Sequence, residues 1–224
     1  MTVIVGGLLG AANQVLAPAQ KKALELDNKK AILKSVMKLE ASSDVEKIYA
    51  DRIKSFVVDA NGNKVAGKVA EDINIRKQSK AKDADRLYPV YKFLSAADKN
   101  KTEAYILPLF GNGLWNNIWG YIALKSDFNT VAGIVFDHAG ETPGLGARIT
   151  EEAIQERYKN RLIFDQNGKL ISVKMVKGEG HPEAELGEHM VDGMSGATLT
   201  ANGVNAMLYT YLDYYLPYIK KNRQ

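Results

Sequence analysis

Cysteine is absent from this chain of 224 residues. Its absence excludes a disulfide framework, a thiolate zinc site, a cysteine-ligated iron–sulfur cluster and a cysteine nucleophile. The absence of cysteine does not decide the cellular compartment of the protein, because an exported protein of this size can fold without disulfides. Proline and glycine number only 6 and 19, which excludes collagen-like and low-complexity chains.

A strong charge of one sign is also missing. Lysine and arginine number 30 against 26 aspartates and glutamates, giving a net charge of +4. This excess is too small and too evenly spread to indicate a nucleic-acid partner. Apolar residues make up 46% of the chain, so we expect a globular protein of one domain or one domain with appendages.

The N-terminus lacks a complete hydrophobic span. Residues 1–20 carry no charge, but the apolar run from Thr2 to Ala12 is interrupted soon afterwards by Asn13, Gln14 and Pro18. A helix that crosses a bilayer needs about 20 apolar residues, and no basic residue precedes the run as in a signal peptide. The run is therefore either an ordinary buried helix or the trailing end of a membrane anchor.

The middle of the chain favours strands. Asn-Gly turns predict two hairpins, one over residues 53–64 and one over residues 162–176, and three further β-like runs cover residues 104–110, 118–124 and 131–136. With helices at the ends, this order predicts an α+β fold with a mainly antiparallel twisted sheet flanked by helices.

Helices are expected in three places. A stalk from Ala19 to about Leu39 presents Leu24, Ile32, Val36 and Leu39 as core-facing positions. A second helix follows Thr150 as its N-cap and runs to about Lys159. The last helix is amphipathic, with Thr200 as its N-cap and an apolar face at Val204, Met207, Leu208, Tyr211, Leu212, Tyr215 and Leu216. Its tyrosines are expected to pack with their hydroxyls in water.

Three glycine-rich stretches are candidates for function. Residues 109–120 hold the two tryptophans beside glycines, which suits a flat apolar ligand or, as the spacing favours, a turn with two core tryptophans. Residues 138–149 would present backbone N–H groups to an anion near a helix start, with Arg148 nearby. Residues 192–200 form either a helix-capping turn or an accessible threonine hydroxyl.

Two other chemistries are weakly supported. Residues 181–189 contain two histidines and three glutamates without a recognised metal-ligand spacing, so a solvated acidic loop is expected. Ser195 lies in Met-Ser-Gly-Ala rather than in the G-x-S-x-G turn of a serine hydrolase. The sequence therefore predicts neither a metal site nor catalytic residues.

Taken together, Gly-Asn-Gly-Leu-Trp (111–115), Glu-Thr-Pro-Gly-Leu-Gly (141–146) and Asp-Gly-Met-Ser-Gly-Ala-Thr (192–198) resemble the FMN-binding domain of the C subunit of sodium-translocating NADH:quinone reductases. The related G subunit of the RNF complex shares the second and third motifs. The first motif, together with His138 ahead of Glu141, favours the C subunit of the reductase. The resemblance implies an electron-relay subunit of a sodium-pumping oxidoreductase, without independent catalysis.

The resemblance also implies the cofactor and its site. A flavin transferase of this family joins FMN through its phosphate to the last threonine of the third motif, here Thr198. Asp192 and Ser195 are then expected to serve recognition or transfer. The remaining residues expected around FMN are Gly196, Ala197, Leu199, Glu141, Thr142, Gly144, Leu145, Gly146, Leu114 and Trp115.

Family members begin with one membrane span followed by a domain on the periplasmic face of the inner membrane. The implied division is a tail of a membrane anchor (1–18), a helical stalk (19–40) and the FMN-binding domain (41–224). The span is incomplete in this chain. The expected partners are the other subunits of the complex, the transferase and the membrane, with no nucleic acid.

Three alternatives remain from the sequence. The chain could be the G subunit of an RNF complex, a standalone flavin-carrying electron shuttle, or a non-redox assembly subunit whose glycine loops and tyrosine-rich helix form only protein contacts. The last alternative predicts a colourless protein even in the presence of a flavin transferase.

Overall fold

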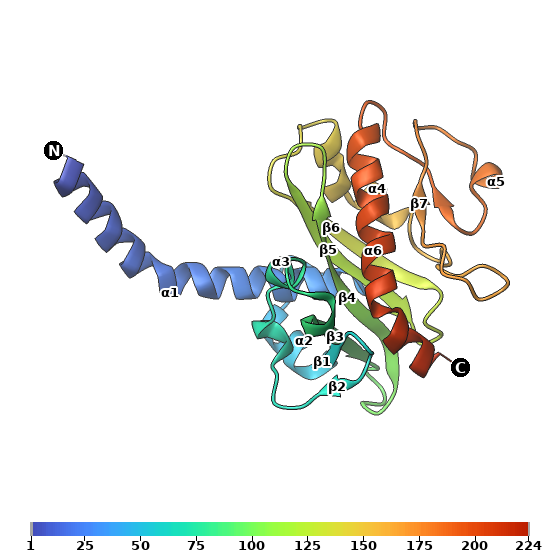
Figure 1. Ribbon diagram of the computed structural model, residues 1–224, viewed down its shortest axis with the longest axis horizontal. Coiled ribbons are helices and arrows are strands. Elements are labelled where there is room, and N and C mark those ends of the chain that lie inside the picture. Colours follow the sequence, from blue (N-terminus) through green and yellow to red (C-terminus); the bar gives the residue numbers. More distant parts are fainter. Residues whose placement is uncertain (1, 224) are drawn as a thin grey trace.

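The computed structural model describes residues 2–223. Its centre is a six-stranded antiparallel sheet in the order β2-β1-β3-β4-β5-β6 (Figure 1). The strands are β1 (Ile53–Asp59), β2 (Lys64–Val65), β3 (Leu87–Leu94), β4 (Thr102–Asn112), β5 (Asn117–Lys125) and β6 (Val131–His138). A separate parallel pair joins β7 (Lys174–Met175) to β8 (Met190–Val191). The predicted α+β class with a mainly antiparallel sheet is confirmed.

Helices flank the sheet. They are α1 (Thr2–Lys34), α2 (Val45–Arg52), α3 (Ile75–Gln78), α4 (Glu152–Glu156), α5 (Glu183–Leu186) and α6 (Thr198–Asn222). Short 3-10 turns are η1 (Ala70–Asp72), η2 (Asp83–Asp85) and η3 (Gly146–Thr150). The bounds of all three expected helices differ: α1 runs from Thr2 to Lys34 rather than from Ala19 to about Leu39, α4 follows Glu151 rather than Thr150, and α6 begins at Thr198 rather than after Thr200.

Helix α6 covers one face of the sheet (Figure 1). The predicted apolar face is buried from Val204 to Tyr215, and Leu216 is half-buried against the same core. It packs on sheet residues such as Leu107 and Ile122. The hydroxyl of Tyr215 donates to the carbonyl of Pro89 at 2.7 Å inside the protein, so the expectation of water-exposed hydroxyls is wrong for this tyrosine.

Helix α1 projects from the domain and bends along its length, with Pro18 inside it (Figure 1). Ile32 and Leu33 near its end are buried with α2 against the opposite face of the sheet. Val15 is 77% exposed and Leu24 is 62% exposed, so neither a buried N-terminal helix nor a core position at Leu24 is observed. Within residues 2–223, no helix has the length and apolar character to cross a membrane.

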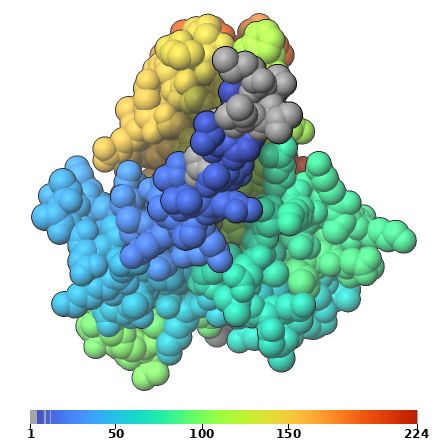
Figure 2. All heavy atoms as spheres, turned by 90° about the vertical axis from the view of Figure 1, so that its left-hand side faces the viewer, coloured from blue at the N-terminus to red at the C-terminus, as the bar shows by residue number. Residues whose placement is uncertain are grey.

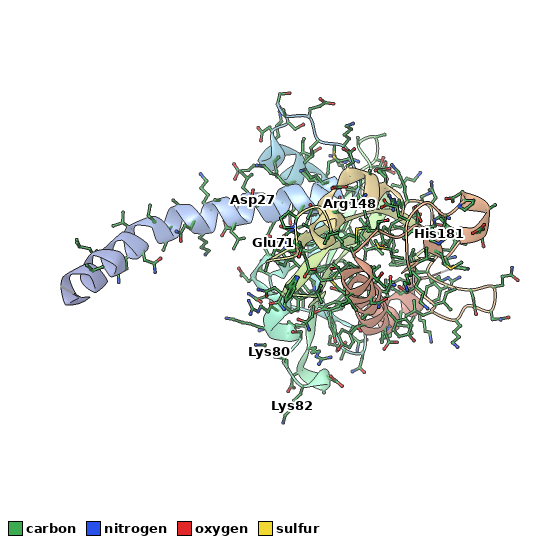
Figure 3. All side chains as sticks on the ribbon, turned by 90° about the horizontal axis from the view of Figure 1, so that it is seen from above. Asp27, Glu71, Lys80, Lys82, Arg148 and His181 are labelled. Carbon is green, nitrogen blue, oxygen red and sulfur yellow. The ribbon has the colours of Figure 1, made fainter. Side chains whose placement is uncertain are left out.

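The face from which α1 emerges is viewed directly in Figure 2. The helix points toward the viewer, with the α2 region on one side and the region of α3 and η2 on the other. Lys80 and Lys82 mark the far edge of that second region in Figure 3, while Asp27 lies on α1 outside the domain. Residues 75–85 contain two short helical turns, α3 and η2.

The two predicted hairpins differ in the structure. The Asn61-Gly62 turn joins β1 to β2, and Gly62 has the positive φ of 75° that the turn needs. The second turn also forms, because the carbonyl of Lys169 accepts from the N–H of Asp165. Its flanks form the isolated bridge between Phe164 and Leu170, and the carbonyl of Ile163 accepts from the N–H groups of Ile171 and Ser172. Residues 174–175 instead join β8, so the second hairpin is much shorter than predicted.

Candidate functional site

Three glycine-rich loops meet at one end of the sheet. They are the β4–β5 turn (112–117), the loop after β6 (139–145) and the loop before α6 (192–197). Figure 1 shows the light-green β4–β5 turn and the gold segment after β6 beside the start of α6. The antiparallel order brings the first two together, because the end of β4 and the end of β6 both flank β5.

A cavity of about 190 Å³ lies between these loops. Its lining residues are Leu114, Glu141, Thr142, Leu145, Gly146, Gly196, Ala197, Thr198, Leu199 and Thr200. Only Thr200 is not among the residues expected around the cofactor. The sequence interpretation missed Thr200 because a hydroxyl in this position of the pattern indicates a helix cap.

Four of the expected residues lie outside the cavity lining. Trp115 stands at its rim, where the indole N–H donates to Thr142 Oγ1 at 3.1 Å. Gly144 has a φ of 73° and shapes the loop after β6. Asp192 accepts from the backbone N–H of Gly180 and the backbone N–H of Ser195 donates to Glu179, and neither partner lines the cavity. Trp115 is 69% exposed, so the expected pair of core tryptophans is wrong.

Glu141 connects all three loops from within the cavity. Its side chain is buried, with 4% of the residue exposed. Oε2 accepts from the hydroxyl of Thr200 at 2.5 Å, and Oε1 accepts from the backbone N–H of Trp115 at 3.0 Å. The backbone N–H of Glu141 donates in turn to His138 Nδ1 at 3.1 Å. The carboxylate therefore fixes the first turn of α6 to both other loops.

Two opposing effects act on the acidity of Glu141. Burial raises its pKa, but hydrogen bonds from Thr200 and from the backbone N–H groups of Trp115, Asn116 and Leu114 lower it and prevail. The pKa of the carboxyl group is therefore below its ordinary value. Glu141 is ionised at neutral pH although it is buried.

Glycine is required on both sides of this carboxylate. A Cβ at Gly146 would collide with Thr200 Oγ1 and with Glu141 Oε2, and a Cβ at Gly113 would collide with Glu141 Oε1. The two glycines let backbone segments close around the side chain. By contrast, a Cβ at Gly140 would meet nothing nearer than Asn116 Cβ at 3.7 Å.

Thr198 is the first residue of α6 and is half-buried at the cavity wall. The described residues offer no hydrogen-bond partner to its hydroxyl, and the backbone N–H groups of residues 198–200 have no carbonyl acceptor. Free N–H groups and the helix dipole make a helix start favourable for an anion. The hydroxyl is thus placed where an attached phosphate would be stabilised.

Exposed apolar side chains surround Thr198. Leu114 is 45%, Leu145 is 41% and Leu199 is 59% exposed, and all three line the cavity with it. Large apolar side chains left in water around a concave site are typical of a ligand-binding or interaction surface. Residues 139–147 carry no charged side chain other than the buried Glu141.

Arg148 does not face the cavity as an anion ligand. Its guanidinium forms a bidentate pair with Glu179, at 2.8 and 2.9 Å, and also contacts Glu151 at 3.3 Å. The pairing with Glu179 raises the pKa of Arg148 further above its usual value. The expectation that Arg148 would contact an anion is therefore not supported by this geometry.

The segment around His181 binds the loop before α6. His181 Nδ1 lies 2.8 Å from Asp192 Oδ1, and the backbone N–H of Gly180 donates to Asp192 Oδ2 at 2.8 Å. Figure 3 shows His181 on the side of the domain away from α1. Across residues 2–223, no group of three histidines, aspartates or glutamates is arranged to hold a metal ion.

A larger groove of about 620 Å³ lies elsewhere, between the end of α1, β6 and α4. Its lining includes Lys34, Met37, Val135 and Gln155 and none of the expected site residues. The smaller cavity is the better candidate, because it joins all three glycine-rich loops with a free hydroxyl and exposed apolar side chains.

Comparison with protein families and curated proteins agrees with this choice. The FMN-binding domain family matches residues 113–213, a range that holds all three loops except Asn112. The C subunit of the Na(+)-translocating NADH-quinone reductase of Neisseria meningitidis serogroup A is 32% identical, covering 98% of this chain and 87% of the relative. The same subunit of Vibrio parahaemolyticus is 34% identical, covering 91% and 84%.

Solved structures match equally well. The crystal structure of the C subunit of the Na(+)-translocating NADH-quinone reductase from Parabacteroides distasonis has 36% sequence identity and a TM-score of 0.79, covering 91% of this chain and 96% of that chain. The Shewanella oneidensis structure named NqrC has 27% identity and a TM-score of 0.76, covering 89% and 98%. Sheet and loops together thus follow an architecture already seen by experiment.

Proposed function

The chain belongs to the family formed by the C subunits of Na(+)-translocating NADH-quinone reductases, and from this premise we propose that Thr198 carries FMN through a phosphoester bond. The FMN-binding domain and the family make it a subunit of an oxidoreductase complex. Its proposed role is to relay electrons between other subunits, with the isoalloxazine ring of FMN supplying the redox chemistry.

The observation that carries the proposal is the setting of the Thr198 hydroxyl. It lies on the wall of the 190 Å³ cavity, at the start of α6, beside exposed Leu114, Leu145 and Leu199. FMN has a phosphate dianion at one end and a flat, largely apolar ring at the other. The free N–H groups of α6 suit the phosphate, and the exposed leucines suit the ring.

Each neighbouring residue then has a part that its contacts support. Leu114, Leu145 and Trp115 would exclude water from the ring, while Thr142 holds the indole of Trp115 by accepting its N–H. Gly196 allows close approach of the loop, because its φ of 72° suits glycine and its position faces Leu145. Asp192 and Ser195 would present the loop to the transferase.

A covalent bond has a clear physical advantage in this role. A tethered flavin stays at a high effective concentration, even where free flavin is scarce. The transfer of FMN to Thr198 is a balanced reaction if the donor is a flavin dinucleotide. The Thr198 oxygen then forms the new P–O bond, the phosphoanhydride bond breaks, and the nucleoside monophosphate leaves while the hydroxyl proton passes to solvent.

The arrangement of the chain suggests how this subunit sits in its complex. We propose that residues 1–18 are the tail of a membrane anchor, residues 19–40 a stalk and residues 41–224 the FMN-binding domain. The support is the exposure of Val15 and Leu24 on α1 and the burial of Ile32 and Leu33 near its end. The domain would lie on the periplasmic side of the inner membrane.

The test is the intact mass of the chain after co-expression with its flavin transferase, followed by peptide mapping of residues 192–200. Wild-type protein and Thr198→Ser, which keeps a hydroxyl, are expected to gain the mass of one FMN minus water. Thr198→Ala should fold and gain nothing.

Flavin that remains on Thr198→Ala after denaturation would refute the attachment site. A wild-type chain that stays colourless beside a transferase shown to be active on another substrate would favour the non-redox assembly subunit. The RNF and shuttle alternatives share the attachment chemistry, and reconstitution with the partner subunits of the reductase separates them.

A further inference from the structure

A charged cluster that does not line the cavity joins η3 and α4 to the loop before α6. Its centre is Glu179, in the segment after β7. Arg148 comes from η3, which directly follows the loop after β6, and Arg157 is the C-cap of α4. The side chains of Arg148 and Glu179 are each 24% exposed.

Glu179 accepts four hydrogen bonds. Arg148 donates to Oε2 at 2.8 Å and to Oε1 at 2.9 Å, and Arg157 donates to Oε1 at 2.9 Å. The fourth donor is the backbone N–H of Ser195 at 3.1 Å, three residues before Thr198. A bidentate guanidinium contact is geometrically specific as well as strong, so the carboxylate has a defined orientation toward Ser195.

Arg157 holds the same loop by its carbonyls. Its guanidinium donates to the carbonyl oxygens of Asp192 at 3.1 Å and of Gly193 at 2.5 Å. Gly193 is itself packed so closely on the 176–178 backbone that a Cβ would collide with the carbonyls of Val176 and Gly178. The Asp192–Gly193 end of the loop is thus held by Arg157, and Glu179 holds the loop at Ser195, three residues before Thr198.

We propose that Glu179 is a positioning residue for flavin attachment, which holds the loop before α6 so that the Thr198 hydroxyl stays at the cavity wall. This inference rests on the proposed function. Neither a sequence motif nor the cavity lining includes Glu179, and its action passes through Ser195 and Arg148 rather than through contact with the cofactor.

The physical reason is the flexibility of this loop. Gly196 directly follows Ser195, and glycine has more backbone freedom to lose than any other residue. Ser195 N–H has no other acceptor among the described residues. Without Glu179 the loop would sample more conformations, and the fraction with a correctly placed hydroxyl would fall.

The cluster also explains why the two arginines do not act as phosphate ligands. Glu179 accepts from both guanidinium groups, and Asp192 Oδ2 lies 3.7 Å from Arg157. Their donors are directed at the loop and at Glu179 instead of the cavity. Glu179 therefore acts on the geometry of the loop and not on the charge of the cavity.

The test compares Glu179→Gln with Glu151→Gln in the full chain. Glu151 contacts the same guanidinium of Arg148 at 3.3 Å but touches no residue of the loop, so its variant is the matched control. Purified apo proteins are incubated with the transferase and a flavin dinucleotide, and labelling of Thr198 is followed by intact mass. We expect kcat/KM to fall about tenfold for Glu179→Gln and to stay within twofold of wild type for Glu151→Gln.

A second readout needs no flavin. Amide hydrogen exchange of apo protein should be about tenfold faster in peptides covering residues 193–198 of Glu179→Gln, with residues 204–219 of α6 unchanged. A merely structural role would accelerate exchange in both regions. Once labelled to completion, the variant should also show lower flavin fluorescence anisotropy than wild type.

The outcomes separate this inference from the function on which it rests. An unlabelled wild-type chain would refute the proposed function. A labelled wild type with equal labelling rates for Glu179→Gln would overturn the positioning role, as would unchanged exchange in residues 193–198. Equal losses in Glu179→Gln and Glu151→Gln would assign the effect to Arg148 and overturn it too.

Discussion

Glu141 and Glu179 both fix the chain near the start of α6, one through Thr200 and the other through Ser195, by different physical means. Glu141 is 4% exposed and accepts from neutral donors, the Thr200 hydroxyl and a backbone N–H. Glu179 has a side chain that is 24% exposed and accepts mainly from two guanidinium groups. The contact of Glu141 with Thr200 and Trp115, called the inner contact below, therefore depends on burial. The contact of Glu179 with Arg148, Arg157 and Ser195, called the outer contact, depends on charge.

This difference decides what each carboxylate contributes. Removing a buried acceptor leaves its donors unsatisfied and away from water, which costs more than the net value of the bond. Partly exposed ion pairs contribute less, and salt screens them. The inner contact should therefore dominate folding stability, while the outer contact should act mainly on the local order of the loop.

The largest expected effect is that of Glu141→Ala. The change leaves the Thr200 hydroxyl and the Trp115 N–H without their acceptor in a buried site. We expect the free energy of unfolding to fall by about 2 to 4 kcal/mol. Urea denaturation of apo protein, followed by circular dichroism, measures it.

Glu151→Ala is the matched control for this substitution, because its side chain is 51% exposed and surface changes of this kind usually stay within about 0.5 kcal/mol. If Glu141→Ala were as stable as Glu151→Ala, the inner contact would have no dominant role. The comparison between the inner and the outer contact would then fail.

The second largest expected effect on stability comes from adding a side chain where the backbone packs closely around Glu141. Gly146→Ala would push a methyl group against Thr200 Oγ1 and Glu141 Oε2, so we expect a loss of about 1 to 3 kcal/mol, as for overpacked cores. Gly140→Ala lies in the same loop with ordinary contacts only and should be nearly neutral. Thermal unfolding of the two variants in parallel tests this contrast, and equal melting temperatures would contradict it.

Much of the fold followed from local patterns. The β-like runs in residues 104–136 and the apolar spacing of the last helix predicted β4, β5, β6 and α6, because their side chains have the period that each element requires. Strand β3 was missed. It contains Pro89, which argues against a central strand, yet Pro89 pairs with Val57 and its carbonyl accepts from Tyr215.

The residues of the site that belong to the three glycine-rich motifs could be predicted from the sequence. Nearly all of the cavity lining came from three short stretches whose resemblance to a family could be read directly. Thr200 and Glu179 could not be found in this way. Thr200 has its partner 59 positions away in Glu141, and Glu179 meets Arg148 across 31 positions. Such residues come together only in the folded protein, and local sequence patterns carry no signal of a contact between distant positions.

The smallest expected effect is on the pH dependence of stability. Hydrogen bonds from Arg148, Arg157 and Ser195 hold the pKa of Glu179 well below its ordinary value. The unfolded chain therefore binds more protons than the folded chain in acid, and this contribution to the free energy of unfolding rises with pH. It is fully present above the ordinary glutamate pKa of about 4.3 and is lost progressively as the pH falls below that value.

Glu179→Gln removes this contribution and should therefore flatten the acid limb of the stability curve. The variant is expected to be about 1 kcal/mol less stable than wild type at pH 7 in low salt, a size typical of partly exposed pairs. The gap should narrow toward pH 3, and it should also narrow in 1 M salt, where the Debye length is about 3 Å. Urea denaturation across this pH range measures both trends. Parallel curves for the two proteins would mean that Glu179 is held by neutral contacts as Glu141 is, and the distinction between a charge-dependent outer contact and a burial-dependent inner contact would not hold.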